Sequence, residues 1–340
     1  MVGMKKLKVA IVGFGSVGRN IAQLLEKRAD DYAQKYDISI QITGVCKSRS
    51  GLIENQHGLS LDEILDIPQY VSGLTNHDFM QRVEADVIID VGPSDYVTGG
   101  SSLEYIRQAL KNKINVICVS KGALVLELES LLELATQNRV KLLYSGATAA
   151  ALPTVDFIRS NLLGCKILTI QGILTGTTNL ILDEMMQNNL SFDDALTKAK
   201  NLGIAEPDSS FDTQGWDTAA KICIIAKTFF KKENIDFYHL SKQGIEHITQ
   251  LDIEHWRLNS LVPRLVGYID CMDHNLSAGV RLELFEKTHP FSLVTGKNKA
   301  LRVLTDDMGE FYISGGASSP VATAAAALKD LEYLILNKLV

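Results

Sequence analysis

Residues 199–221 gather the side chains best suited to acid–base chemistry. The stretch holds four carboxylates, Glu206, Asp208, Asp212 and Asp217, and ends on Lys221. The pattern from 216 to 227 indicates a helix, so Asp217 and Lys221 share one of its faces. The helix continues with apolar residues on nearly every side, which predicts burial, and a lysine entering a buried helix needs a partner or a substrate. The alternative is an acidic surface loop followed by an ordinary exposed ion pair.

A glycine-rich turn near the start of the chain is suited to binding a phosphate. It reads Gly13-Phe14-Gly15-Ser16-Val17-Gly18 and lies between an apolar strand at 7–12 and a predicted helix. The first glycine permits a tight turn, the second lets main chain approach a pyrophosphate, and the third lets helix and strand pack closely. The free N–H groups at the helix start then face the phosphates. We therefore predict a dinucleotide site; the alternative is a glycine-rich turn without a ligand.

The end of the second predicted strand, 38–46, indicates which dinucleotide is bound. An acidic residue there would bind the ribose 2′-hydroxyl of NAD, but the chain reads Cys46-Lys47-Ser48-Arg49-Ser50. The cations Lys47 and Arg49 suit a 2′-phosphate, so NADP is favoured over NAD. A solvated basic turn is the alternative interpretation.

Four further residues follow predicted strands or open a predicted helix. Ser94 follows the strand at 85–92, and Lys121 ends the strand at 114–120, where ligands bind in parallel sheets. Gly176 and Thr177 open a helix and offer N–H and hydroxyl donors to a bound carboxylate. A solvated strand-end lysine and simple helix capping are the competing interpretations.

The elements that must position these residues form two patterns. Strands and helices alternate to about residue 145, which predicts an α/β fold with a doubly wound, parallel Rossmann-type sheet. From 146 the pattern changes to helices followed by strand-like segments at 264–270, 277–285 and 300–305, which predicts an α+β domain with a largely antiparallel sheet. We expect a nucleotide-binding domain at 1–145 and a catalytic domain at 146–315.

Composition narrows the function classes. A net charge of −6 argues against nucleic acid or an anionic membrane as the main partner. No apolar run approaches the roughly 18 residues of a membrane span, and the start of the chain lacks a signal-peptide pattern. The cysteines are scattered, odd in number and without metal-ligand spacing, which indicates free thiols in a reducing compartment. We expect a cytoplasmic protein that acts on a small molecule.

Taken in chain order, these motifs resemble the homoserine dehydrogenase family over nearly the whole chain. The resemblance rests on GFGSVG at 13–18, SKG at 120–122, ATAAALPTVDFIR at 147–159 and GILTGTTN at 172–179. The most specific match is LGIAEPDSSFDTQGWDTAAK at 202–221, which is similar to the family signature at nearly all of its fixed positions. The resemblance implies interconversion of L-aspartate 4-semialdehyde and L-homoserine with NAD(P)H.

Roles for individual residues follow from this resemblance. Lys221 would donate the proton to the carbonyl oxygen, and Lys121 would lie near nicotinamide and substrate. The substrate would be held by the following residues: Glu206 and Asp217 at its amino group with Asp212 beside them, and Gly176 and Thr177 lining the pocket. The C-terminal segment 316–340 would rejoin the nucleotide domain, with Gly316 near the cofactor. A homodimer formed through the second domain's sheet is also implied.

The sequence departs from the family pattern at three places. Ser145 stands where the family often has Glu, at a monovalent-cation site whose other ligands would be the main-chain carbonyls of Thr148, Ala150 and Leu152. Ile204 replaces a common Tyr, and Ser319 replaces the second glycine of a C-terminal Gly-x-Gly. The chain matches neither an aspartate kinase domain nor a C-terminal regulatory domain, so we expect no threonine feedback through one.

Two other functions remain open at this point. A different NAD(P)-dependent amino-acid or semialdehyde reductase could share the nucleotide domain, but would not need the set Glu206, Asp217 and Lys221. A non-catalytic nucleotide sensor predicts a degraded motif in the second domain, whereas Lys121 and that set are all present. Fold alone does not separate these possibilities.

Overall fold

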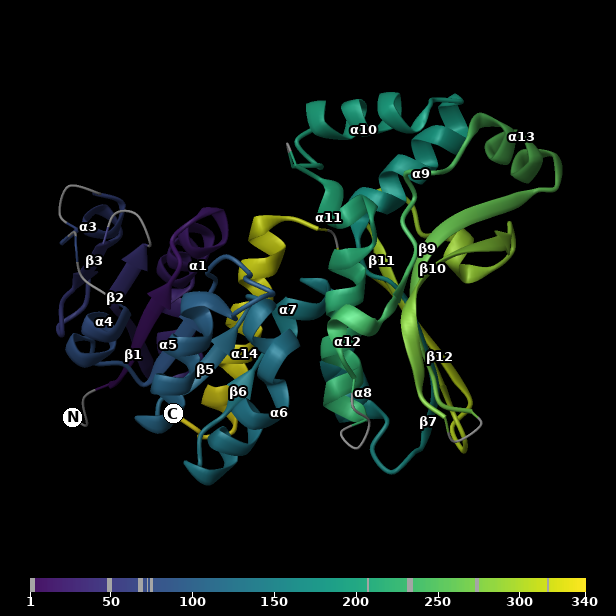
Figure 1. The fold of residues 1–340 in the computed structure, drawn as a ribbon. Helices are drawn as coiled ribbons and strands as arrows, with labels where there is room; N and C mark the ends of the chain where they lie inside the picture. Colours follow the sequence, from purple (N-terminus) through teal and green to yellow (C-terminus); the bar gives the residue numbers. More distant parts are fainter. Residues whose placement is uncertain are drawn as a thin grey trace. The chain divides into compact units, whose positions relative to one another are not determined.

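The computed structural model describes residues 4–47, 51–66, 70–71, 73, 76–206, 208–230, 235–272, 275–316 and 318–340 (Figure 1). The chain forms two compact units. The first comprises the chain up to Ala147 together with Ser319–Val340, and the second comprises Thr148–Ser318. Each has its own six-stranded sheet. Within the described residues, no helix is long and apolar enough to cross a membrane.

The sheet of the first unit has the order β3-β2-β1-β4-β5-β6. Its strands are β1 (Lys5–Val12), β2 (Ile38–Lys47), β3 (Gly51–Glu54), β4 (Val87–Asp90), β5 (Asn115–Cys118) and β6 (Leu142–Leu143). β2, β1, β4, β5 and β6 are parallel, which confirms the doubly wound prediction. The antiparallel edge strand β3 was not predicted. Chain order reverses between β1 and β4, so the ligand crevice of such a sheet lies beyond their carboxyl ends.

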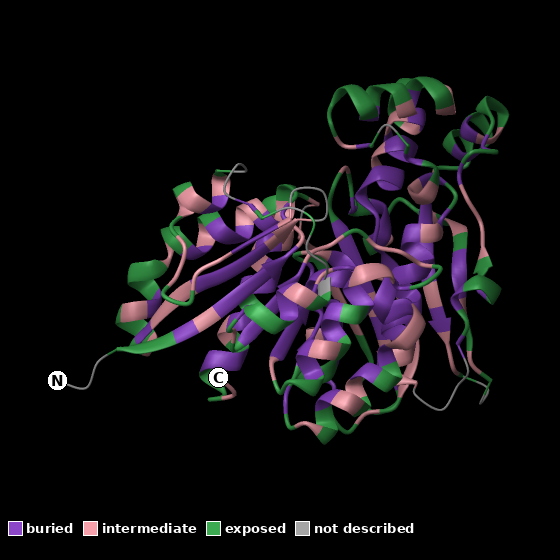
Figure 2. Cartoon of the chain, turned by 60° about the vertical axis from the view of Figure 1, so that its left-hand side comes forward, coloured by how far each residue is buried: buried purple, intermediate pink, exposed green. Residues whose placement is uncertain are grey.

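Helices surround this sheet and bury its strands on both faces, as the purple strands in Figure 2 show. They are α1 (Ser16–Lys27), α2 (Ala29–Tyr36), α3 (Leu61–Leu65), α4 (Asn76–Arg82), α5 (Gly100–Lys111), α6 (Gly122–Gln137) and the C-terminal α14 (Pro320–Leu336). α14 packs beside α1 and places Ala324, Leu328 and Leu331 in the same hydrophobic core as β1. Ser319 caps α14, because its side chain accepts a hydrogen bond from the Ala322 N–H at 3.1 Å.

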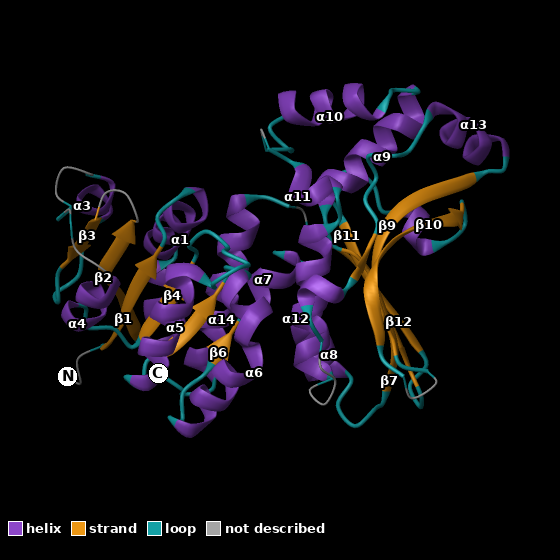
Figure 3. Cartoon of the chain, in the orientation of Figure 1, coloured by secondary structure: helices purple, strands orange, loops and turns teal. Residues whose placement is uncertain are grey.

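The second unit has a mixed, mostly antiparallel sheet of order β12-β11-β7-β9-β10-β8 (Figure 3). Its strands are β7 (Ile167–Ile173), β8 (Ser241–Lys242), β9 (Leu261–Asp270), β10 (Ser277–Glu286), β11 (Lys299–Thr305) and β12 (Glu310–Gly315). β8 pairs with β10 in parallel, and the other pairs are antiparallel. The predicted α+β organisation is therefore confirmed.

The helical elements after α6 begin with α7 (Ser145–Ala149), which leads into the second unit. There the chain adds α8 (Thr154–Asn161), α9 (Gly176–Asn188), α10 (Phe192–Asn201), α11 (Ser210–Thr213), α12 (Trp216–Phe229), η2 (Phe237–His239), α13 (Gln250–Leu258) and η3 (Pro290–Leu293). α9, α12 and α13 pack against β9. Gly267 of β9 lets α12 approach, since a Cβ there would lie 2.4 Å from Ile222 Cγ1. This close packing sets the position of the helix that carries Asp217 and Lys221.

Candidate active site

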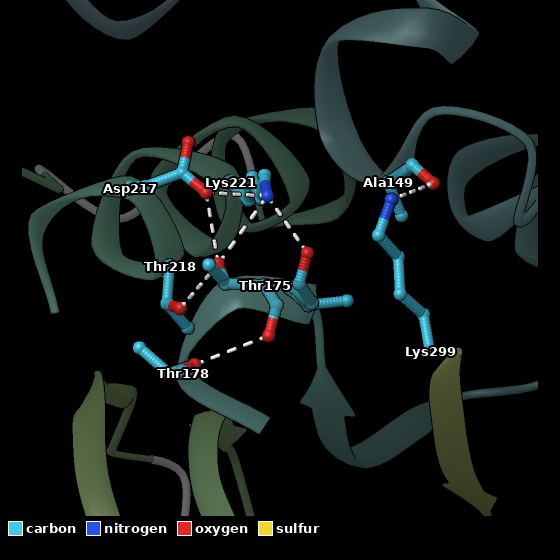
Figure 4. Close-up of polar contacts among 8 residues, drawn as sticks. Ala149, Thr175, Thr178, Asp217, Thr218, Lys221 and Lys299 are labelled. Carbon is cyan, nitrogen blue, oxygen red and sulfur yellow. Dashed lines mark hydrogen bonds and ion pairs between the residues drawn. The ribbon is translucent and has the colours of Figure 1, made fainter. Parts of the chain in front are cut away.

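Asp217 and Lys221 form a buried ion pair on α12. Lys221 Nζ lies 2.5 Å from Asp217 Oδ2, and the two side chains are 11% and 12% exposed (Figure 4). The i,i+4 spacing accounts for the contact, and the apolar helix accounts for the burial. The surface-pair alternative is therefore wrong, because both charges have been largely removed from water.

The end of β7 completes this cluster. Lys221 Nζ also donates to the Leu174 carbonyl at 2.7 Å and to Thr175 Oγ1 at 3.3 Å. Thr175 Oγ1 in turn donates to Asp217 Oδ2 at 2.8 Å and lies 2.9 Å from Thr218 Oγ1. The ammonium is thus held by three oxygens of different kinds. Sequence reasoning missed Thr175, whose one signal was its place directly before Gly176.

Thr175 is also the N-cap residue of α9, so the predicted carboxylate site adjoins the lysine cluster. Gly176 and Thr177 are the first residues of α9 and are both buried. The first N–H groups of a helix have no partner within the helix and favour an anion. A Cβ on Gly176 would lie 3.1 Å from both Lys297 Cα and Ser318 Oγ, so the helix start is closely packed.

The other carboxylates of the 199–221 stretch differ in their surroundings. Glu206 is exposed, and Asp212 is half-buried on α11. Asp208 accepts hydrogen bonds from the Ser210 side chain at 2.6 Å and the Ser210 N–H at 3.1 Å, which lower its pKa. Asp208 therefore stabilises a turn, and its carboxylate is already engaged by Ser210.

The three glycines of the turn in the first unit have the different roles expected in a dinucleotide-binding loop. Gly13 has φ +89°, and a Cβ there would lie 2.6 Å from the Gly92 nitrogen. A Cβ on Gly18 would lie 2.4 Å from the Gly13 carbonyl oxygen, whereas a Cβ on Gly15 would meet open space. The outer glycines thus serve packing, and the middle one leaves room for a ligand beside the start of α1. Ser16 and Val17 open that helix, and Phe14 is buried in the core.

Lys47 is the last residue of β2 and lies next to this loop. The carbonyl of the preceding residue, Cys46, accepts a hydrogen bond from the Gly13 N–H at 2.9 Å. Lys47 is half-buried and pairs with Gly51 of β3. Arg49 lies outside the described residues.

A buried carboxylate joins the loops that follow β4 and β5. Asp90, the last residue of β4, accepts hydrogen bonds from the hydroxyls of Ser120 and Ser102, the latter at 2.9 Å. Burial raises its pKa, and these hydrogen bonds oppose the shift. On the same two loops, Ser94 Oγ accepts from the Lys121 N–H at 2.9 Å. Sequence reasoning missed Asp90, although a carboxylate ending an otherwise apolar strand was a usable signal.

The residues expected near a monovalent cation have two different kinds of surroundings: Ser145 is bonded to the C-terminal helix, and the others form a main-chain turn. Ser145 donates through its hydroxyl to Asp330 of α14 at 2.6 Å. Thr148, Ala150 and Leu152 belong to the turn that opens the second unit, where Lys299 Nζ donates to the Ala149 carbonyl at 3.0 Å (Figure 4). Gly316 packs on this turn, because a Cβ there would lie 2.5 Å from the Leu152 nitrogen. Within the second unit, Gly316 is therefore a packing residue, and its predicted cofactor contact remains a prediction.

Comparison with known proteins gives consistent matches along the chain. Residues 13–145 match the family model described as the homoserine dehydrogenase NAD-binding domain, and residues 153–331 match the model described as homoserine dehydrogenase. A homoserine dehydrogenase of Methanocaldococcus jannaschii is 31% identical over 96% of this chain and 98% of its own. An NAD(+)-dependent homoserine dehydrogenase of Pseudomonas canavaninivorans is 28% identical over 97% of both.

The same similarity holds in three dimensions. The crystal structure of a putative homoserine dehydrogenase from Archaeoglobus fulgidus superposes with a TM-score of 0.86 at 31% identity. The match covers 97% of this chain and 99% of that one. Both units therefore have their counterparts in a single solved chain.

Proposed function

Since this chain belongs to the homoserine dehydrogenase family, it catalyses the NAD(P)-dependent interconversion of L-homoserine and L-aspartate 4-semialdehyde, and we propose that Lys221 is its proton donor. The reaction serves threonine and methionine biosynthesis. The observation that carries the proposal is the buried ammonium of Lys221, held by Asp217, Thr175 and the Leu174 carbonyl. The test is the Lys221 substitution described in the Discussion.

The direction of proton movement follows from the chemistry of an aldehyde. The nicotinamide, when bound, supplies or accepts the hydride. Reduction leaves negative charge on the carbonyl oxygen, and a lysine ammonium can donate a proton to that oxygen as the charge develops. In homoserine oxidation the same nitrogen takes the proton from the hydroxyl. Asp217 and Thr175 fix the direction in which Nζ points, so we assign both a positioning role.

Recognition of the substrate requires groups for both of its charged ends. Its carboxylate would bind the N–H groups of Gly176 and Thr177 at the start of α9. Its ammonium would bind carboxylates, for which Glu206, Asp212 and the outer oxygen of Asp217 are the candidates. Asp217 Oδ2 is engaged by Lys221 and Thr175, and Figure 4 draws the other carboxylate oxygen turned away from them.

The first unit would bind the dinucleotide and the second the substrate. The open space at Gly15, beside the N-terminus of α1, supports a pyrophosphate position there. Ser94 and Lys121 follow β4 and β5, beyond the carboxyl ends of the parallel strands. We assign Lys121 to nicotinamide and substrate, with Asp90 as the buried anchor of its loop.

NADP is the cofactor that the basic end of β2 favours. Replacing Lys47 by alanine is expected to raise KM for NADP about tenfold, because a charge-assisted contact to the 2′-phosphate is lost, and to leave KM for NAD nearly unchanged. Homoserine oxidation with each cofactor measures this. Lys27→Ala, which removes an exposed lysine at the end of α1, is the matched control.

An equal rise in both KM values would contradict the NADP assignment. A wild-type preference for NAD over NADP would contradict it as well; the Pseudomonas canavaninivorans relative is named an NAD(+)-dependent enzyme.

A homodimer is proposed on the open face of the second sheet. Tyr268, Gln171, Arg302 and Tyr312 lie directly opposite one another on neighbouring strands, and all are half-buried. Arg302 bonds Gln171 and Glu310, both at 2.7 Å. We expect sedimentation to give the mass of two chains for wild type and of one for Arg302→Glu, because the substitution replaces the cation of this row by a carboxylate beside Glu310, which Arg302 now binds. A wild-type monomer would contradict the proposal.

The cytoplasm is the proposed location. None of the five cysteines forms a disulfide, and burial raises the pKa of Cys46 and Cys118 and that of Cys223 to about 11. Thiols outside disulfides, three of them with a raised pKa, fit a reducing compartment.

A further inference from the structure

Lys299 is a buried lysine for which the chemistry above has no use. It is the first residue of β11, it is 3% exposed, and its Nζ donates to the Ala149 carbonyl. Among the residues that the structure describes, the buried lysines are this one and Lys221. Taking an ammonium out of water is costly unless protein oxygens replace its hydration shell. A lysine kept at such a place indicates oxygens that need a positive charge.

Those oxygens belong to a tight main-chain turn. α7 ends at Ala149, where the last carbonyls of a helix lack partners within it. The Ala149 carbonyl accepts from the Leu152 N–H at 3.1 Å as well as from Lys299, and Ala150 has φ +50°. The left-handed conformation of Ala150 ends the helix and leaves its last carbonyls to partners outside it.

The β11–β12 hairpin holds Lys299 against the turn. Lys299 pairs with Gly315, and the next residue, Gly316, packs on the main chain of Ala151 and Leu152. A Cβ at Gly316 would lie 2.9 Å from the Ala151 carbonyl carbon, so only glycine allows this approach. Main-chain packing therefore fixes the hairpin against the turn, and the Lys299 side chain reaches from the hairpin to the Ala149 carbonyl (Figure 4).

This turn does not fit an added monovalent metal ion. Its carbonyls, at Thr148, Ala150 and Leu152, are the ligands that the family resemblance implies. The Leu152 carbonyl already accepts from the Thr154 N–H at 2.9 Å, and the ammonium is bonded to the Ala149 carbonyl, next to those of Thr148 and Ala150 in the chain. Two like charges within one turn would repel each other at short range.

We propose that the Lys299 ammonium is a built-in substitute for a monovalent cation at the 148–152 turn, so that the enzyme needs neither Na⁺ nor K⁺. An ammonium carries the same single charge, and it is bonded to the Ala149 carbonyl, which lies between two of the implied ligands in the chain. Because it is covalently attached, it cannot exchange with the solution. Lys299 is thus a positioning residue, which acts through the turn.

The first experiment uses the wild-type enzyme. Homoserine oxidation and thermal unfolding of the cofactor-free protein are measured in KCl, NaCl and choline chloride at equal ionic strength. We expect the same kcat, KM and Tm in all three salts. A saturable rise of kcat or Tm with K⁺ or Na⁺ over choline would overturn the proposal. The unfolding measurement does not depend on the catalytic assignment of Lys221, so the two can fail separately.

The second experiment creates the cation requirement. Lys299→Ala removes the ammonium and leaves room for an ion, and Lys299→Gln keeps a hydrogen-bond donor without charge should the alanine variant fail to fold. We expect both variants to have a lower Tm and kcat than wild type in choline chloride. Each value should rise part of the way back when K⁺ or methylammonium replaces choline. Lys287→Ala, at an exposed lysine of the same unit, should show no cation response. Variants that are destabilised equally in every salt would refute the proposal, since a merely structural lysine predicts that outcome.

Discussion

Replacing Lys221 by alanine is expected to lower kcat for homoserine oxidation about 10²- to 10⁴-fold while NADP still binds. Removal of a proton donor affects the chemical step, and the dinucleotide loop lies in the other unit of the chain. The absorbance of reduced nicotinamide follows turnover, and fluorescence of bound NADPH follows affinity. Loss of cofactor binding in step with kcat would point to a folding defect and would count against the assignment.

The burial of the ion pair requires a second variant. Without Lys221, Asp217 is left as a buried carboxylate lacking its cation, which costs about 3–5 kcal/mol in comparable pairs. The double variant Asp217→Asn, Lys221→Met removes both charges and should regain most of the Tm lost by Lys221→Ala. It should remain as inactive as the single variant. Recovery of activity in the double variant would exclude Lys221 as the proton donor.

A matched control is available on the same helix. Lys227 lies in the last turn of α12, away from the cluster around Thr175, and is half-buried. Lys227→Met is expected to keep kcat within about twofold of wild type. A fall as large as that of Lys221→Ala would mean that α12 tolerates no loss of a lysine, and the proton-donor assignment would lose its support.

Alanine substitutions at Gly13 and Gly15 are expected to have opposite consequences. Gly13→Ala should destabilise the first unit by about 3 kcal/mol or more, because its φ of +89° and the 2.6 Å approach to Gly92 both exclude a side chain. Gly15→Ala should leave Tm unchanged, since a Cβ there meets open space. It should raise KM for NADP at least about tenfold, because the methyl group occupies the space proposed for the pyrophosphate.

Thermal unfolding of the cofactor-free protein measures the effect on stability. NADPH binding measures the effect on the cofactor site. The useful comparison is within the pair, because both variants add the same single methyl group to the same loop. If Gly15→Ala binds NADPH as wild type does, the pyrophosphate does not lie against Gly15. If Gly13→Ala unfolds at the wild-type temperature, Gly13 does not need the left-handed conformation and the close approach to Gly92.

Local features of this protein were readable from the sequence because they depend on residues close together in the chain. A four-residue spacing on a helix places Asp217 beside Lys221 whatever surrounds it, and the apolar residues after Lys221 require burial. The glycine spacing at 13–18 reflects backbone conformations and close approaches within a single strand–turn–helix unit. Alternating strand and helix patterns were sufficient for the doubly wound sheet of the first unit.

Contacts between distant segments were decided only by the tertiary structure. Thr175 reaches Asp217 across 42 positions because the end of β7 meets α12, and Asp90 meets Ser120 across 30 because the neighbouring strands β4 and β5 end side by side. The strand order of the second sheet, with β7 inserted between β11 and β9, has no local signature.

Lys299 shows most clearly what could not be predicted from the sequence alone. A lysine at the start of a strand pattern is ordinarily solvated, and only the register of β11 with β12 and the packing of Gly316 place it on a carbonyl 150 positions away. The sequence therefore determined which residues could carry charge and which backbone could turn. The sheets and their packing decided which of those charges are buried, and it is burial that makes a charge costly enough to require a specific partner.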